Sequence, residues 1–213
     1  AVEKKIRPTE IKYKIIINKD FSIDTNVSFI SLGSNRSAAI SSDGRVFTWG
    51  MNDRGKLGDG TTIERYLPTE ITDKFALEDR EKVVGLTFGN YSAAITNTGR
   101  LFTWGDYSKV PIEITNIFSL GDGEKVIGVD LGEYHSAVIT NYGRVFTWGD
   151  NYYGQLGDGT KIDRDIPTEI TDKFILQDDE KVIEVRLGDC HSTALTNLGR
   201  LFTWGYNWYG QLG

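Results

Sequence analysis

One tetrapeptide, Phe-Thr-Trp-Gly, occurs four times in this chain of 213 residues and constrains its fold more than any other feature. The tryptophans of the four copies are Trp49, Trp104, Trp148 and Trp204. Successive copies are 55, 44 and 56 residues apart. Self-similarity at such a period is typical of repeat architectures, in which each repeat forms one small structural unit. The repeat therefore bounds the fold class before any other feature is considered.

Each tryptophan follows the same lead-in, a serine with small and aliphatic residues and then a turn that contains Gly-Arg. The four turns are Asp43-Gly44-Arg45, Thr98-Gly99-Arg100, Tyr142-Gly143-Arg144 and Leu198-Gly199-Arg200. Glycine can supply the positive φ of a tight hairpin, so the flanking segments are expected to pair as antiparallel strands. Side chains alternate along a strand, which places the rings of Phe47 and Trp49 on one face, where they can pack against the next unit.

Three of the four Trp-Gly pairs are followed by the same pattern. It consists of an asparagine, two further residues and then Gly-Lys-Leu-Gly or Gly-Gln-Leu-Gly. These segments are Asn52–Gly58, Asn151–Gly157 and Asn207–Gly213. The first and third copies run on to Pro-Thr-Glu-Ile at Pro68 and Pro167, and the same element stands at Pro8. The second copy passes almost directly from Gly105 to Pro111. A deletion in this loop accounts for most of the short period.

The pattern predicts an all-β fold without a long helix. Short runs rich in Val, Ile, Phe, Thr and Trp are bounded by Gly, Asn and Asp, as strands bounded by turns are. A small sheet cannot bury both faces alone, so neighbouring sheets must stack, and radial stacking gives a β-propeller. We expect a single repeat domain over 1–213. Its expected parts are a tail of a preceding repeat at 1–31, repeats at 32–87, 88–130 (shortened) and 131–186, and a truncated repeat at 187–213.

The segment from Gly132 to Gly157 resembles the repeat of the regulator of chromosome condensation family, and the resemblance extends over nearly the whole chain. It implies β-propeller blades, usually seven in a complete ring. Four repeat cores are present here, so the favoured interpretation is an incomplete propeller that belongs to a longer chain. A ring of four units, or closure by self-association through open blade edges, is the alternative.

Composition narrows the classes of partner. The formal net charge of −6 disfavours binding to a phosphate backbone, so no nucleic acid is expected as a partner. A single cysteine excludes an internal disulfide framework. No apolar run is long enough to span a bilayer, and membrane insertion is not expected. Closely similar repeats rich in Ile, Asn, Lys and Tyr suggest recent duplication in an AT-rich genome. A bacterial protein that is secreted or at the cell surface is therefore favoured over a cytoplasmic one.

The two histidines, His135 and His191, precede the repeat serine in the third and fourth copies. A catalytic histidine needs a partner group held at hydrogen-bond distance, and no such constellation is visible. Recurrence at one repeat position favours a structural hydrogen bond, in keeping with the four structural tryptophans. Two histidines on separate repeats and one unrelated cysteine make no zinc pattern. The Asp-Gly loops lack the spacing of calcium or phosphate sites and indicate turns. We therefore expect no catalytic residue, no metal and no cofactor.

Aromatic residues after the Trp-Gly pairs are the better candidates for function, because they vary in type while the surrounding frame repeats. Tyr and Trp are favoured at interface hot spots, since they bury much area at little entropic cost. The residues expected to contact a partner are Tyr107, Tyr152, Tyr153, Trp208 and Tyr209. The alternative is that these side chains only cover a neighbouring blade. The acidic segments between repeats are either solvated loops or a negative rim that steers a basic partner.

The function expected from these observations is that of a non-catalytic scaffold that binds a protein partner. The family resemblance implies two alternatives. One is guanine-nucleotide exchange on a small GTPase, which the acidic balance and the lack of a basic tail argue against. The other is inhibition of an enzyme, as by the β-lactamase inhibitory proteins that share the propeller. A hydrolase or transferase is not expected, since no set of catalytic partners is present.

Overall fold

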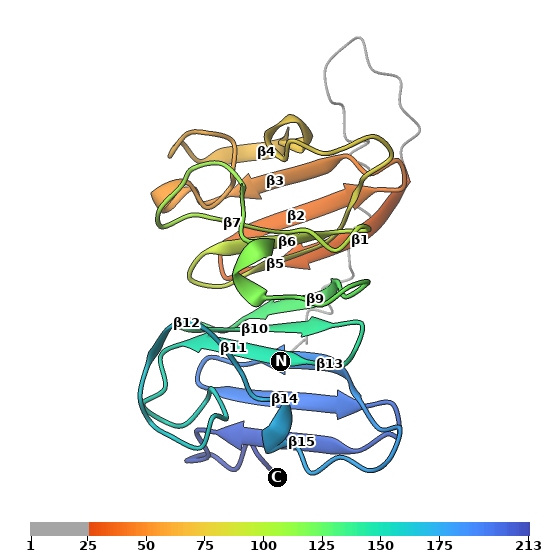
Figure 1. The fold of residues 1–213 in the computed structure, drawn as a ribbon. Helices are drawn as coiled ribbons and strands as arrows, with labels where there is room; N and C mark the ends of the chain where they lie inside the picture. The colour runs from red at the N-terminus through yellow and green to blue at the C-terminus, as the bar shows by residue number, and fades with distance from the viewer. Residues whose placement is uncertain (1–25) are drawn as a thin grey trace, which may run out of the picture.

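The computed structural model describes residues 26–213, which form four antiparallel sheets that follow one another in chain order (Figure 1). The first sheet contains β1 (Val27–Leu32), β2 (Arg36–Ser41), β3 (Val46–Gly50) and β4 (Arg65–Glu70). The second contains β5 (Val83–Phe88), β6 (Ser92–Thr96), β7 (Leu101–Trp104) and β8 (Ile112–Glu113). The third contains β9 (Val126–Leu131), β10 (His135–Thr140), β11 (Val145–Gly149) and β12 (Arg164–Glu169). The fourth contains β13 (Val182–Leu187), β14 (His191–Thr196) and β15 (Leu201–Gly205).

Helical structure in the described part of the chain is limited to short 3-10 turns. These are η1 (Asp53–Gly55), η2 (Thr72–Lys74), η3 (Thr115–Phe118) and η4 (Thr171–Lys173). The predicted all-β architecture is confirmed. The predicted hairpins are also found, because β6 pairs with β7 across Gly99, whose φ is +93°. No helix between residues 26 and 213 has the length and apolar character needed to cross a bilayer.

The sheets pack face to face through their inner strands, because β1 contacts β5, β5 contacts β9 and β9 contacts β13. Each junction is filled by an apolar cluster that draws residues from both sheets. A phenylalanine from the segment after each outer strand meets the next sheet edge to face: Phe75 lies 5.4 Å from Phe102 and 5.6 Å from Trp104, between ring centroids. The Phe and Trp of a repeat therefore pack against the preceding repeat, and the expected contact with the next unit is wrong.

The arginine of each Gly-Arg turn forms ion pairs at the end of the sheet where that turn lies. Arg100 lies over the ring of Phe102 and pairs with Glu81 at 2.7 Å and with Glu113 at 2.6 Å. Burial would raise the pKa of Glu81, but hydrogen bonds from the backbone of Glu78 and from threonine and arginine side chains outweigh it and lower the pKa to about 2. Glu124 and Glu180 are bound in the same way by the arginines of the third and fourth sheets.

The outer strands β4 and β12 form the exposed edges of their sheets, and each carries a proline, Pro68 or Pro167. Proline lacks the N–H that a further strand would need, which is why it is confined to edge strands. The fourth sheet has three strands in the described part of the chain, and its outermost strand is β15.

The sheets are offset from the repeats read in the sequence. The strand β5, for example, opens the second sheet, but all of it except Phe88 falls within the repeat assigned to 32–87. The repeat boundaries remain a prediction about sequence units, and each sheet combines the end of one unit with the core of the next. The element at Pro8 and most of the tail assigned to 1–31 lie outside the described residues.

Candidate partner-binding surface

The loops that follow the third strands all leave their sheets at the same end. The strands β3, β11 and β15 run in one direction (Figure 1), so the segments after Gly50, Gly149 and Gly205 lie on the same side of the molecule. The acidic segments between repeats lie at the opposite end, beside the Gly-Arg turns. Their best-buried carboxylates, Glu81 and Glu180, are held by arginine and do not form a free negative rim.

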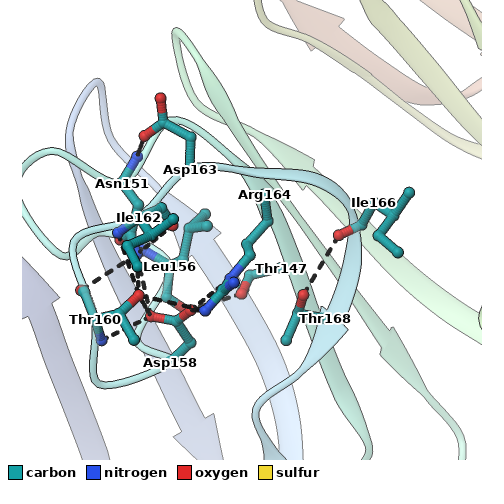
Figure 2. Close-up of polar contacts among 10 residues, drawn as sticks. All are labelled: Thr147, Asn151, Leu156, Asp158, Thr160, Ile162, Asp163, Arg164, Ile166 and Thr168. Atoms are coloured by element: carbon teal, nitrogen blue, oxygen red, sulfur yellow. Dashed lines mark hydrogen bonds and ion pairs between the residues drawn. The ribbon is translucent and has the colours of Figure 1, made fainter.

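The loop between β11 and β12 is held by a polar network centred on Asn151 (Figure 2). The buried side-chain amide of Asn151 donates to Asp158 Oδ1 at 3.1 Å and to the carbonyl oxygens of Thr160 and Ile162 at 3.2 and 3.1 Å. Its Oδ1 accepts from the backbone N–H of Leu156 at 3.0 Å. One side chain thus closes a loop of more than ten residues.

Asp158 is the second centre of this network. Its Oδ1 accepts from the backbone N–H and the hydroxyl of Thr160, and its Oδ2 accepts from Arg164 Nε at 2.8 Å. Burial would raise the pKa of Asp158, but hydrogen bonds from Thr160, Arg164 and Asn151 outweigh it and lower the pKa to about 2. The β3–β4 loop repeats the arrangement with Asn52, Asp59, Thr61 and Arg65. The Asp-Gly pairs therefore serve the turns of these loops.

The same loops cover the next sheet. The indole N–H of Trp104 donates to the carbonyl oxygen of Lys56 at 2.9 Å, and that of Trp204 donates to the carbonyl oxygen of Gln155 at 2.8 Å. Glycine is needed beside the indole, because a Cβ on Gly157 would lie 2.7 Å from Trp204 Nε1 and the residue has a φ of +74°. Between the residue that gives this carbonyl oxygen and the glycine stands a leucine, Leu57 or Leu156, and its side chain is fully buried.

A polar side chain at the start of each second strand links its sheet to the next. Arg36 donates to the carbonyl oxygen of Gly89 at 2.8 Å, and the hydroxyl of Tyr91 lies 2.7 Å from Ser136 Oγ. His135 Nε2 lies 2.9 Å from Ser192 Oγ. The Ser192 hydroxyl donates its proton to the carbonyl oxygen of Gln155, so His135 donates from Nε2.

Burial governs the ionisation of two of these linking residues. Removal from water lowers the pKa of His135 to about 4, and its Nδ1 is buried without a hydrogen-bond partner. Burial likewise raises the pKa of the Tyr91 phenol to about 12. Both side chains are therefore neutral at pH 7. His191 occupies the same repeat position as His135, but it is half-buried and has no following described sheet to bind.

Four tyrosines on the loops of the third and fourth sheets lie in contact, and we call them the tyrosine ladder. The ring centroids of Tyr152 and Tyr153 are 4.9 Å apart, those of Tyr153 and Tyr206 are 4.6 Å apart, and those of Tyr206 and Tyr209 are 6.2 Å apart. Tyr152 and Tyr209 are 69% and 84% exposed. The ladder crosses from the third sheet to the fourth, and Tyr206 within it is half-buried.

The residues predicted to contact a partner are therefore only partly gathered. Tyr152, Tyr153 and Tyr209 share the ladder. Tyr107 stands fully exposed on the short loop between β7 and β8, and Trp208 is 80% exposed, and neither ring contacts another described aromatic ring. Tyr107 and Tyr152 are exposed although a further sheet follows each of their loops, whereas no described sheet follows the loop that carries Trp208 and Tyr209. Their role in binding stays a prediction.

Among residues 26–213, no group of three or more His, Cys, Asp or Glu side chains is placed to hold a metal ion. Several polar groups at the loop end are engaged with one another, as Asp158 is with Arg164 and as His135 is with Ser192. The contacting tyrosines give this end of the molecule a partly aromatic surface.

Comparison with protein families decides where the chain belongs. The family model described as "Regulator of chromosome condensation (RCC1) repeat" matches residues 43–95 and 142–195, and a second model of the same repeat matches residues 27–56, 126–155 and 182–211. The chain belongs to the RCC1 repeat family. The resemblance inferred from the segment Gly132–Gly157 is thereby confirmed, and the four sheets are blades of an RCC1-type β-propeller.

Known RCC1-repeat proteins are similar over most of this chain. The ultraviolet-B receptor UVR8 of Arabidopsis thaliana is 27% identical over 196 residues, which is 88% of this chain and 43% of the receptor. The crystal structure of human WBSCR16 covers 91% of this chain with a TM-score of 0.78 and 29% identity, and 51% of that chain is matched. Prp20p of Saccharomyces cerevisiae, described with its binding to Gsp1p and histones, covers 86% with a TM-score of 0.70 and 25% identity, and 45% of that chain is matched. The chain spans about half the length of these proteins, or less.

Sequence reasoning missed two residues that RCC1-type packing makes important. Tyr206 connects the two halves of the ladder, and its signal was its place directly after the fourth Trp-Gly pair. Tyr91 replaces the arginine or histidine of the other repeats, and its signal was a lead-in one residue shorter than the others. The hydrogen bond of His135 agrees with the geometry expected of a structural histidine, although its contribution to stability stays a prediction.

Proposed function

We propose that this RCC1-repeat chain is a non-catalytic scaffold that binds a protein partner through the tyrosine ladder. The observation that carries the proposal is the row of four contacting rings, in which Tyr152 is 69% exposed although a further sheet follows its loop. Tyrosine is enriched at interface hot spots because its rigid ring buries much area and its hydroxyl can still donate a hydrogen bond.

The loop beneath the ladder supports this function through its rigidity. Asn151 and Asp158 fix the loop that carries Tyr152 and Tyr153, and the backbone N–H of Tyr153 donates to Gln155 at 2.9 Å. A side chain that is already held in place loses less conformational entropy on binding, so preorganisation strengthens association. The buried network supplies the frame, and the variable residues at its surface supply the contacts.

Relatives support the same class of function. The solved structure of Prp20p is described with its binding to Gsp1p and to histones, so an RCC1 propeller of similar structure binds proteins. This support is an analogy at the level of the fold, and it does not name a partner for this chain. The compartment in which the chain acts stays a prediction.

The test is quantitative affinity capture from an extract of the source organism, with three forms of the chain compared by isotope-labelled mass spectrometry. The ladder variant replaces Tyr152, Tyr153, Tyr206 and Tyr209 by alanine. The control variant replaces Tyr66 and Tyr142, which are exposed tyrosines outside the ladder. A partner retained by the wild type and the control, and bound at least about tenfold more weakly by the ladder variant in calorimetry, supports the proposal. Equal capture by all three folded forms contradicts it.

Two narrower functions are separated by direct assays. Nucleotide exchange on a small GTPase would accelerate the release of a fluorescent nucleotide, and enzyme inhibition would lower the turnover of a candidate target such as a β-lactamase. Either activity would have to depend on the ladder residues to agree with the proposal. Activity that is equal in the ladder variant would place the contact surface elsewhere.

A further inference from the structure

The short loop between β7 and β8 leaves a hollow of about 500 Å³ between the second and third sheets. In the first and third sheets the equivalent loops carry a leucine, Leu57 or Leu156, whose side chain is fully buried. Figure 2 shows Leu156 within its loop. The second sheet instead turns back through a hydrogen bond from Gly105 N–H to the carbonyl oxygen of Ser108 and has no such leucine. A cavity of this size is typical of a binding pocket.

Part of what the missing loop would supply is replaced from within the chain. In the neighbouring junctions a backbone carbonyl oxygen accepts from the repeat serine and tryptophan together, as that of Gln155 accepts from Ser192 and Trp204. In the second junction Tyr91 takes this place, because its hydroxyl lies 2.7 Å from Ser136 Oγ and binds the indole of Trp148.

The remaining part is not replaced. The threonine hydroxyl of the Phe-Thr-Trp-Gly element donates to the leucine carbonyl oxygen in the other three sheets, as Thr147 does to Leu156 at 2.8 Å. The hydroxyl of Thr103 has no hydrogen bond to any described residue, and Thr103 lines the hollow. The second junction therefore has an empty space where the other junctions hold a leucine. It also has a Thr103 hydroxyl free to donate to the carbonyl oxygen of such a residue.

The lining combines an apolar interior with a negative rim. Trp148, Tyr107, Tyr134 and Ile112 form walls that fit an aliphatic side chain. At the rim, Asp106 is neutralised by Arg54 at 2.7 Å and Arg164 by Asp158 at 2.6 Å. Glu133 and Asp165 also line the hollow and form no ion pair with any described residue, so the rim carries net negative charge.

We infer that this hollow is a docking pocket for a leucine-bearing turn of a partner protein, flanked by a lysine or arginine. The leucine side chain occupies the space that Leu57 and Leu156 fill elsewhere, and its carbonyl oxygen accepts from Thr103. The flanking cation lies beside Glu133 or Asp165. The inference rests on the proposed function, because the pocket is a second contact site on the same scaffold. The experiment on the tyrosine ladder does not test this pocket.

The probe for the test is a synthetic peptide with the sequence of residues 51–65 of this chain, in which Arg54 precedes the turn Gly55-Lys56-Leu57-Gly58. It is titrated into the isotope-labelled chain at millimolar concentration, and the indole N–H signals are followed by NMR. We expect saturable shifts of the Trp148 indole and the Thr103 amide. The Leu57→Asp peptide is expected to bind at least about tenfold more weakly. No shift, or equal binding of the two peptides, would overturn the inference.

Two variants locate the binding on the protein. Ile112→Glu places a charge on the exposed wall and is expected to weaken peptide binding about tenfold, while Thr103→Val removes the donor and is expected to weaken it about threefold. Grafting the β11–β12 loop in place of residues 106–110 should abolish binding by filling the hollow. The ladder variant should bind the peptide as the wild type does, which separates failure of this inference from failure of the proposed function. Binding that is unchanged by Ile112→Glu in a folded protein contradicts the pocket.

Discussion

The junction between the first two sheets and the junction between the second and third solve the same packing problem with different groups. In the first, the Gly-Lys-Leu-Gly segment gives a buried leucine and a carbonyl oxygen for Trp104 and Ser92. In the second, a loop several residues shorter leaves only the hydroxyl of Tyr91 to bind Ser136 and Trp148. The comparison teaches that one well-placed hydroxyl preserves the sheet-to-sheet contact, whereas the volume of the lost loop stays open.

The largest expected effect comes from removing the leucine that seals a complete junction. Leu156→Ala leaves a cavity in a fully buried site and is expected to lower the free energy of unfolding by about 2–4 kcal/mol, and Leu57→Ala by a similar amount. Ile112→Ala, on the exposed wall of the second junction, serves as the matched control with a change within about 0.5 kcal/mol. Urea unfolding measures all three. Equal stability of Leu156→Ala and wild type would show that the leucine is dispensable to the junction.

The stability of the junction between the third and fourth sheets, where His135 is buried, is expected to depend on pH. The pKa of His135 is lowered to about 4 in the folded protein, while an unfolded histidine has a pKa near 6.5. The unfolded state therefore binds more protons in this window, so stability is present above about pH 6.5 and is lost as the pH falls toward 4. The loss is on the order of 2 kcal/mol at pH 5.

Substituting the two histidines one at a time shows which of them is responsible for the pH dependence of stability. His135→Gln should flatten the pH dependence of the unfolding midpoint between pH 6.5 and 5, and His191→Gln, at the half-buried position on the fourth sheet, should leave most of it. Thermal unfolding followed by circular dichroism gives the measurement. A slope that survives His135→Gln would assign the titration to another group and would refute the role given to burial at this junction.

A smaller effect is expected at the second junction. Tyr91→Phe removes the hydroxyl shared by Ser136 and Trp148 and is expected to cost about 1–2 kcal/mol, because two donors lose a partner in a buried setting. Tyr107→Phe, on the fully exposed ring nearby, is expected to change stability by less than about 0.5 kcal/mol. If the two substitutions were equal in chemical denaturation, Tyr91 would not be the substitute for the missing loop.

The smallest effect concerns the uncovered face of the fourth sheet and the self-association proposed for open blades. Leu201 on β15 is 66% exposed, whereas its repeat counterparts Leu101 and Val145 are fully buried against the next sheet. Leu201→Lys places a charge on the face that a further blade would cover, so we expect weaker concentration-dependent association at high protein concentration and little change in stability. Sedimentation velocity of both forms gives the comparison. Identical association would place the contact between copies on another surface.

Much of the fold follows directly from the sequence, since the spacing of Trp49, Trp104, Trp148 and Trp204 and the glycine turns predict repeated antiparallel hairpins. The shortness of the helical turns also agrees with prediction. The direction of packing does not follow, because alternation along a strand shows which side chains share a face but not which neighbour that face meets.

The candidate site is less predictable, because its chemistry depends on residues far apart in the chain. The loop tyrosines could be identified as variable positions in a repeated frame. The contact between Tyr153 and Tyr206 depends on how two sheets stack, and the bond from Tyr91 to Ser136 crosses a junction. The deletion after Gly105 is visible in the spacing, yet the hollow that it leaves appears only when the neighbouring sheet is in place.

The prolines of the outer strands also restrict how the molecule behaves in a crowded solution. Strand addition along β4 or β12 needs an unbroken row of donors, and Pro68 and Pro167 interrupt it. Copies of the chain, or nascent chains on neighbouring ribosomes, are thus denied an extended ladder along these two edges. A repeat that carries its own proline brings this protection with it whenever it is duplicated, so such an array can lengthen without gaining a new route to fibrils at those edges.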